Sequence, residues 1–169
     1  MRYEVVWSGN SMKTPAFTKK FAIGLLDVIL ILILVSYIIL RLSGGGVAVV
    51  SGRSMEPTLH TGDVVIYINS SPKELKEGDV VIYESNGDLV IHRIVYKYEV
   101  GSRTCFVIQG DNNPRPDVGD PESCPPTTAY PVYGIPEEWI RGKVVDAGGY
   151  VLKVPYIGIL TLMLHELLG

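Results

Sequence analysis

The most apolar part of the chain runs from Phe21 to Leu40 and is interrupted chiefly by Asp27. Twenty helical residues rise about 30 Å, the thickness of the hydrocarbon core of a bilayer. The run has no polar face of the kind that a helix on a soluble core would show. A cleaved signal peptide would have a shorter apolar region and small residues at its end. Residues 21–41 are therefore predicted to form a retained transmembrane helix.

Residues 1–20 are polar and are predicted to be a cytoplasmic tail. Three lysines lie before the apolar run (Lys13, Lys19 and Lys20), and two arginines follow it (Arg41 and Arg53). Positive charge favours the cytoplasmic side of a membrane helix. This small bias places the remainder of the chain on the exoplasmic side.

From Val47 onward the pattern is typical of β-strands. Short runs rich in Val, Ile and Tyr alternate with Gly, Asp and Pro, and 18 glycines with 11 prolines favour tight turns. The hexapeptide Gly-Asp-Val-Val-Ile-Tyr occurs twice, and Asn86-Gly87 predicts a β-hairpin. Residues 47–153 are thus predicted to form a mainly β domain. Its strands are expected at 47–51, 62–67, 78–83, 89–96, 104–109 and 139–146, with a long Pro-rich loop at 114–136.

Residues 154–169 are predicted to be helical. The segment is too short to span a bilayer. Gly158, Thr161 and His165 recur at helical spacing among apolar residues. The pattern favours an amphipathic helix that lies at a membrane interface or packs on the domain.

Charge and cysteine usage narrow the classes of partner. The net charge is −3, so the composition does not indicate the basic surface that a nucleic-acid-binding protein would have. The three histidines and two cysteines lack metal-ligand spacing, so neither a metal nor another cofactor is expected. Cys105 and Cys124 form a disulfide if this part of the chain lies outside the cytosol, and are otherwise free thiols.

Ser54 is the candidate nucleophile. It follows a glycine on a predicted bend and precedes Met-Glu-Pro-Thr, so its hydroxyl can project rather than pack. Such a hydroxyl needs a neighbouring base, and the base needs an orienting carboxylate. His92 lies in the middle of a predicted strand, and Asp111 and Asp117 follow a later strand. Each residue alone is typical of a loop, a core or a turn, but their order beside a membrane anchor indicates a serine hydrolase. The similar Ser8–Met12 segment lacks the Glu-Pro-Thr and the strand, and is interpreted as coincidence.

These residues resemble the type I signal peptidases, most closely the archaeal enzymes and the catalytic subunit of the endoplasmic-reticulum complex. The similarity covers residues from about 47 to 161, and its blocks occur in the family's order. The blocks are Ser54-Met-Glu-Pro-Thr58, Gly62-Asp-Val-Val65, Val90-Ile-His-Arg-Ile94, Gly110-Asp-Asn-Asn113 with Asp117, and Val154-Pro-Tyr-Ile-Gly158.

The resemblance implies a role for each candidate residue. Ser54 would be the nucleophile and His92 the general base, in the place where the bacterial branch has a lysine. Asp117 matches the acid that pairs with the histidine, and Asp111 matches a second acidic position. Two prolines stiffen the chain before Asp117, whereas Asp111 lies in a Gly-Asp-Asn-Asn turn. Asp117 is therefore predicted to bond His92, and Asp111 to support the turn.

The resemblance also implies the reaction, a membrane-bound serine endopeptidase that removes signal peptides by cutting after small residues. Its partners would be signal peptides, membrane lipid and possible further subunits of a complex. The Pro-containing spacer before Asp117 favours an archaeal membrane, with the endoplasmic reticulum as the alternative. Gly52 stands where several relatives have a serine that helps to bind the oxyanion, so the groups that complete the oxyanion hole stay open.

Two other hypotheses compete with that of a signal peptidase. A repressor-type autoprotease would share the β framework, but it calls for a soluble chain and a lysine base. An inactive membrane-tethered β module, or a noncatalytic subunit of a secretory complex, needs no catalytic residues at all.

Overall fold

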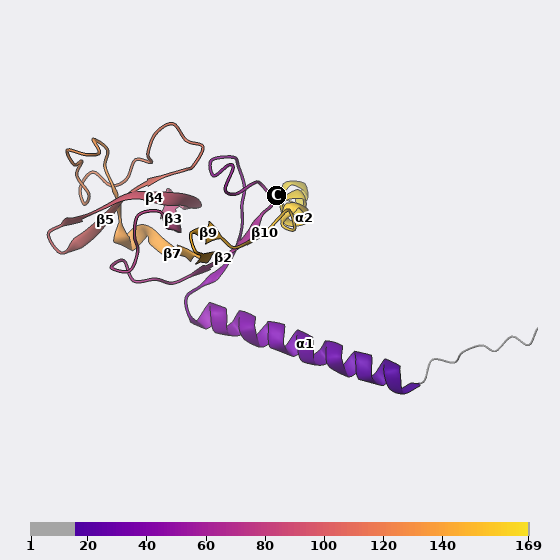
Figure 1. The fold of residues 1–169 in the computed structure, drawn as a ribbon. Coiled ribbons are helices and arrows are strands. Elements are labelled where there is room, and N and C mark those ends of the chain that lie inside the picture. Colours follow the sequence, from indigo (N-terminus) through magenta and orange to yellow (C-terminus); the bar gives the residue numbers. More distant parts are fainter. Residues whose placement is uncertain (1–15, 169) are drawn as a thin grey trace, which may run out of the picture. The chain divides into compact units, whose positions relative to one another are not determined.

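The computed structural model describes residues 16–168, and the chain divides into a unit that ends at Ile39 and one that begins at Leu40 (Figure 1). Helix α1 spans Ala16–Leu42, so the predicted helix is present and begins earlier than expected. Within the described residues, Lys20–Leu42 is the one segment long and apolar enough to cross a membrane. Its apolar side chains are exposed, as those of a lipid-facing helix would be.

The second unit is built on antiparallel β-sheet, which confirms the predicted fold class (Figure 1). The sheet has the order β1-β2-β7-β3-β4-β5-β6, and β10 also pairs with β2, while β8 and β9 form a separate ribbon. The strands are β1 (Gly46–Val49), β2 (Val64–Ile68), β3 (Val80–Ser85), β4 (Asp88–Val100), β5 (Arg103–Gln109), β6 (Ile135–Pro136), β7 (Ile140–Val144), β8 (Asp146–Ala147), β9 (Tyr150–Val151) and β10 (Lys153–Val154).

The repeated hexapeptide forms the same turn twice, at residues 62–63 and 78–79. The glycine has a positive φ in both copies, 89° and 92°, a conformation that favours glycine. In the first copy the glycine N–H donates to the Val50 carbonyl, and the Val50 N–H donates to the aspartate carbonyl. Ile94 makes the same two hydrogen bonds with the glycine and aspartate of the second copy. Each aspartate carboxylate also accepts the N–H of the third residue before it, at 3.0 Å.

The predicted hairpin at Asn86-Gly87 is confirmed. Both residues have positive φ, 53° and 88°, which is the signature of a type I′ turn. The turn sets the register in which β3 and β4 pair from Ser85 and Asp88 onward. That register decides which side chains of β3 lie beside His92.

The boundaries of four predicted segments are wrong. The strand expected at 139–146 is a 3-10 helix, Glu137–Trp139, followed by β7 and β8, and the loop at 114–136 ends in β6. The C-terminal helix α2 spans Ile159–Leu168 and not 154–169, because Val154 pairs with Val64 in β10. Pro155 explains this difference, since the residue before a proline is pushed towards the β conformation. The strand expected at 47–51 ends at Val49.

The cysteines form a disulfide, which decides between the two alternatives left open by the sequence. Cys105 in β5 is bonded to Cys124, with their Cα atoms 5.8 Å apart. The bond closes the first part of the Pro-rich loop onto the sheet.

Strand β3 separates two apolar clusters and contributes to both. Val80 and Ile82 face the first cluster, while Val81 and Tyr83 face the second. The first cluster also buries Met55 and Leu59, which follow Ser54 on the loop between β1 and β2 (the Ser54 loop). Its members are Val50, Met55, Leu59, Val65, Val80, Ile82 and Val144. The second consists of Leu75, Val81, Tyr83, Ile94, Phe106, Ile108 and Ile135.

Candidate active site

The structure brings together three of the four candidate residues. Ser54 lies on the loop between β1 and β2, His92 in the middle of β4, and Asp117 on the loop after β5. The Nε2 atom of His92 is 2.9 Å from Ser54 Oγ, and its Nδ1 atom is 2.5 Å from Asp117 Oδ2. The His92 side chain is 8% exposed, so the imidazole bridges the other two residues with little access to water.

The Ser54 loop is held by buried side chains and by hydrogen bonds from Asn112. Met55 and Leu59 are buried in the first apolar cluster, and the Leu59 N–H donates to the Met55 carbonyl. The Asn112 N–H donates to the Ser54 carbonyl at 2.8 Å, and its Nδ2 donates to the Arg53 carbonyl at 3.1 Å. The Gly-Asp-Asn-Asn turn therefore holds the main chain of the candidate nucleophile.

Asp111 takes part in a different ion pair. Arg93, the neighbour of His92, donates to it from Nε and Nη2 at 2.8 and 2.7 Å. Burial pushes the pKa of Asp111 upward. The hydrogen bonds from Arg93 and Thr58, with the arginine charge, outweigh that effect and hold this pKa below its ordinary value. Asp111 thus anchors the turn to β4, while Asp117 contacts the imidazole.

Tyr83 is a partner of Asp117 that the sequence analysis missed. Its hydroxyl donates to Asp117 Oδ2 at 2.9 Å, the same oxygen that faces His92. Burial, and then the Asp117 charge and hydrogen bond, raise the pKa of Tyr83 well above its ordinary value, so the hydroxyl keeps its proton. One signal was available, because a tyrosine in a buried strand usually requires a hydrogen-bond partner.

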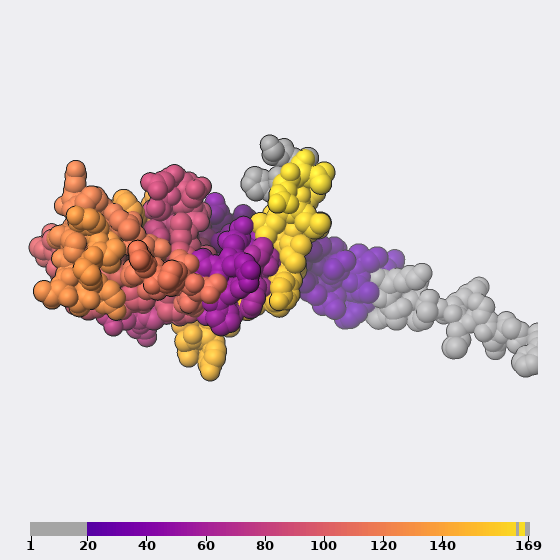
Figure 2. Space-filling view, turned by 90° about the horizontal axis from the view of Figure 1, so that it is seen from above, coloured from indigo at the N-terminus to yellow at the C-terminus, as the bar shows by residue number. Residues whose placement is uncertain are grey.

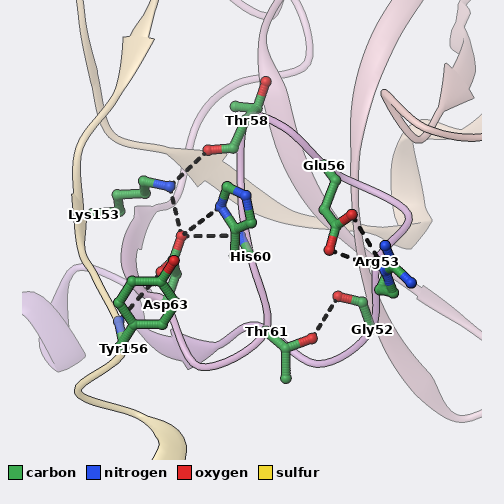
Figure 3. A network of polar contacts seen from close by, with 9 residues as sticks. All are labelled: Gly52, Arg53, Glu56, Thr58, His60, Thr61, Asp63, Lys153 and Tyr156. Carbon is green, nitrogen blue, oxygen red and sulfur yellow. Dashed lines mark hydrogen bonds and ion pairs between the residues drawn. The ribbon is translucent and has the colours of Figure 1, made fainter.

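A second polar network holds the far end of the Ser54 loop (Figure 3). The Asp63 carboxylate, 1% exposed, pairs with Lys153 of β10 at 2.6 Å. It also accepts the N–H groups of His60 at 3.0 Å and Tyr156 at 3.3 Å. Burial raises the pKa of Asp63, but these three donors together lower it below its ordinary value. Lys153 Nζ also donates to the Thr58 carbonyl at 3.0 Å, so the C-terminal segment is tied to the loop that carries Ser54.

A cleft of about 400 Å³ adjoins Ser54. Strand β1, the outermost in the sheet order, forms one wall, and residues 89–91 of β4 contribute to the lining. The lining is mostly aliphatic, with Tyr67 and the two serines 51 and 54 as its polar members. The cleft therefore places a mostly apolar space beside a hydroxyl that is bonded to an imidazole.

The amino-acid sequence matches a known family over this region. The family model described as Peptidase S24-like matches residues 36–116, which include Ser54 and His92. The catalytic subunit SEC11 of the signal peptidase complex from Pyricularia oryzae is 31% identical over 123 residues, covering 71% of this chain and 64% of the relative. The SEC11C subunit from Homo sapiens is 28% identical over 134 residues, covering 76% and 62%.

The chain is similar to the type I signal peptidases, in their endoplasmic-reticulum branch. It spans 64% of the length of the fungal relative. These relatives are fungal and mammalian, and they give no support to the archaeal preference drawn from the spacer before Asp117. The family match ends at residue 116, directly before Asp117.

Proposed function

We propose that this chain is a membrane-bound serine endopeptidase that removes signal peptides from preproteins by cutting after small residues. Ser54 is the nucleophile, His92 the general base, and Asp117 the carboxylate that orients His92. The observation that carries the proposal is the continuous contact from Ser54 Oγ through the His92 ring to Asp117, beside an apolar cleft.

The geometry supports acyl transfer in two steps. His92 Nε2 takes the proton of Ser54 as Oγ attacks the scissile carbonyl carbon, and the Asp117 carboxylate stabilises the resulting imidazolium. When the C–N bond breaks, the imidazolium gives that proton to the departing amine and an ester on Ser54 remains. Water, activated by the same imidazole, then hydrolyses the ester and releases the signal peptide.

Main-chain N–H groups at the bend are the candidate donors of the oxyanion hole. The Nδ2 group of Asn112 donates to the Arg53 carbonyl, so this carbonyl points towards Asn112. Because the N–H and the C=O of a peptide unit point in opposite directions, the Ser54 N–H is aimed away from Asn112. Gly52 has a φ of 95°, and Thr61 Oγ1 donates to its carbonyl at 2.8 Å, which fixes the preceding peptide (Figure 3). One such donor typically contributes about 10²- to 10³-fold in rate.

The cleft supports binding of an extended peptide as an added strand. An outermost strand offers unpaired main-chain groups along one side, and β1 occupies that position next to Ser54. In this mode main-chain hydrogen bonds provide affinity, and pockets for alternate side chains provide selectivity. A cleft of about 400 Å³ shared by several substrate residues leaves room for small side chains near the serine.

Exposed apolar residues support contact with membrane lipid. Val47 and Ile66 are paired across β1 and β2 and are 49% and 45% exposed. The short helix α2 exposes Leu160 and Met163, and Figure 2 shows α2 on the surface of the unit. The disulfide supports an oxidising compartment, on the exoplasmic side of the membrane.

Cleavage of a signal-peptide substrate by the full chain in detergent micelles tests the proposal. Ser54→Ala should abolish cleavage with the fold intact, and Asp117→Asn should lower kcat by about 10⁴-fold because an amide cannot stabilise the imidazolium. Ser11→Ala, in the similar segment outside the described residues, is the matched control and should be fully active.

Each alternative has its own outcome in this assay. A fully active Asp117→Asn variant would reduce the catalytic group to Ser54 and His92. Absence of cleavage by the wild-type chain would favour the inactive module. A Ser54-dependent cut within the chain itself would favour the autoprotease.

A further inference from the structure

One oxygen atom of Asp117 receives two donors. The His92 Nδ1 atom lies 2.5 Å from Oδ2, and the Tyr83 hydroxyl lies 2.9 Å from the same atom. The Tyr83 side chain comes from β3 and the whole residue is 2% exposed. Its hydroxyl is therefore held inside the domain and directed at the carboxylate, with no direct bond to the imidazole.

The sheet places Tyr83 beside His92. Val81 pairs with His92 across β3 and β4, and Tyr83 pairs with Val90. Residues two apart on a strand share a face, so Tyr83 is the diagonal neighbour of His92 on the same face of the sheet. Their ring centroids are 6.5 Å apart. A carboxylate over this face can bond both side chains at once.

Asp117 itself lacks the support of a strand. It follows β5 on the Pro-rich loop, and its main chain is held by one hydrogen bond, from its N–H to the Ile108 carbonyl at 2.8 Å. The Tyr83 ring, in contrast, is packed in the second apolar cluster with Phe106 and Ile135. The rigid partner is thus the tyrosine, and the residue that needs an anchor is the aspartate.

We propose that Tyr83 is a positioning residue for the catalytic group, which fixes the Asp117 carboxylate so that Oδ2 faces His92 Nδ1. The inference rests on the proposed function of Ser54, His92 and Asp117. With Oδ2 fixed, the imidazole keeps its proton on Nδ1 and presents the lone pair of Nε2 to Ser54 Oγ. The competing view is that Tyr83 is a core residue whose hydroxyl takes the nearest acceptor.

The Tyr83→Phe substitution separates these views, because the ring stays and only the hydroxyl is lost. We expect kcat to fall by about 10- to 100-fold, the usual scale for a lost hydrogen bond to a charged group. Without the donor, the Asp117 carboxylate is no longer held with Oδ2 facing His92 Nδ1, so the pH profile of kcat should also change.

Other groups around His92 stay the same in this variant. The Asp111 carboxylate acts on the imidazole through its charge, and Arg93 pairs with Asp111. Neither contacts Tyr83. Tyr98→Phe is the matched control, because it removes a half-buried hydroxyl of β4 that donates to the Pro125 carbonyl at 3.0 Å, away from the catalytic group. It should leave kcat and the pH profile unchanged.

The NMR signal of the His92 Nδ1 proton in the full chain gives a readout that does not depend on cleavage. A change of this signal in Tyr83→Phe, in a chain whose wild type cuts no peptide, would overturn the proposed function and support the positioning by Tyr83. Wild-type cleavage, with the same kcat and the same Nδ1 proton signal in Tyr83→Phe, would overturn the positioning and leave the function standing. In a chain that already carries Asp117→Asn, Tyr83→Phe should lower kcat little further. If the losses of kcat from the two substitutions were fully additive, the inference would also be overturned.

Discussion

Removal of the Lys153 charge should both destabilise the domain and slow catalysis. Lys153 Nζ lies 2.6 Å from Asp63 and also donates to the Thr58 carbonyl, on the loop that carries Ser54. The Lys153→Met substitution keeps an apolar stem of similar length and removes the ammonium. It leaves the Asp63 carboxylate, 1% exposed, without its cation.

The magnitude follows from the burial of the pair. Breaking a buried ion pair by removing one partner typically costs about 3–5 kcal/mol. Lys153 is 27% exposed and Asp63 keeps two main-chain N–H donors, so we expect a loss of about 2–3 kcal/mol in the free energy of unfolding. For a domain of this size the thermal midpoint should fall by about 6–12 °C. We expect kcat to fall by about tenfold, because the loop that carries Ser54 loses its bond to Lys153.

The pH dependence of stability gives an independent check. The pKa of Asp63 is lowered in the folded chain. Its contribution to stability is therefore complete above the ordinary carboxyl pKa and is lost as pH falls through the lower, folded value. Without Lys153 the folded pKa rises towards the ordinary value, so the variant should lose less stability than the wild type as the pH falls through this range.

Lys143→Met is the matched control, because Lys143 pairs at 2.8 Å with Asp79, the aspartate of the second Gly-Asp turn. Chemical denaturation should give both variants a similar loss of stability, whereas only Lys153→Met should slow peptide cleavage. A loss below about 0.5 kcal/mol for Lys153→Met, the scale of a solvated surface pair, would refute the reasoning. Equal loss of kcat in both variants would refute the specific link to the serine loop.

Three further predictions concern the framework of the site. Asp111→Asn should lower both the thermal midpoint and kcat, because its arginine partner loses a bidentate carboxylate; a change in only one of these would contradict the anchoring role. The double substitution of Cys105 and Cys124 by serine should cost about 3 kcal/mol, from the loop-closure entropy of a 19-residue separation, and an unchanged denaturation midpoint would contradict it. Gly78→Ala should cost about 1–2 kcal/mol through its positive φ alone. Gly62→Ala should cost more in the same denaturation assay, because its Cβ would also lie 2.4 Å from Ile159, and equal losses would show that this contact relaxes freely.

Local sequence was sufficient where a local rule decides the structure. Asn86-Gly87 predicts its own turn, because two residues with positive φ are needed there. The apolar run predicts α1 by its length, and the repeated Gly-Asp pairs predict two turns. Asp117 contacts His92, as the stiff Pro-containing spacer indicated.

The missed features depend on register between distant segments. Tyr83 and Arg93 each look like ordinary strand residues, and only the pairing of β3 with β4 and the path of the loop bring them to Asp117 and Asp111. The sequence around Asn112 predicts only a turn, yet its side chain donates a hydrogen bond to the Arg53 carbonyl, 59 positions earlier. Strand β10 was missed because two residues are too few for any periodic pattern.

The sheet order has a consequence for the order in which the proposed catalytic group can assemble. Strands β3, β4 and β5 follow one another as hairpins, so the histidine and its aspartate come from segments that pair early and locally. The loop that carries Ser54 lies between β1 and β2, on the other side of β7, and besides β1 the partners of β2 are residues 143–144 and 153–154. During synthesis these segments are made after Ser54, His92 and Asp117. The framework that holds the loop of Ser54 can therefore be completed only after residues 143–154 have been made.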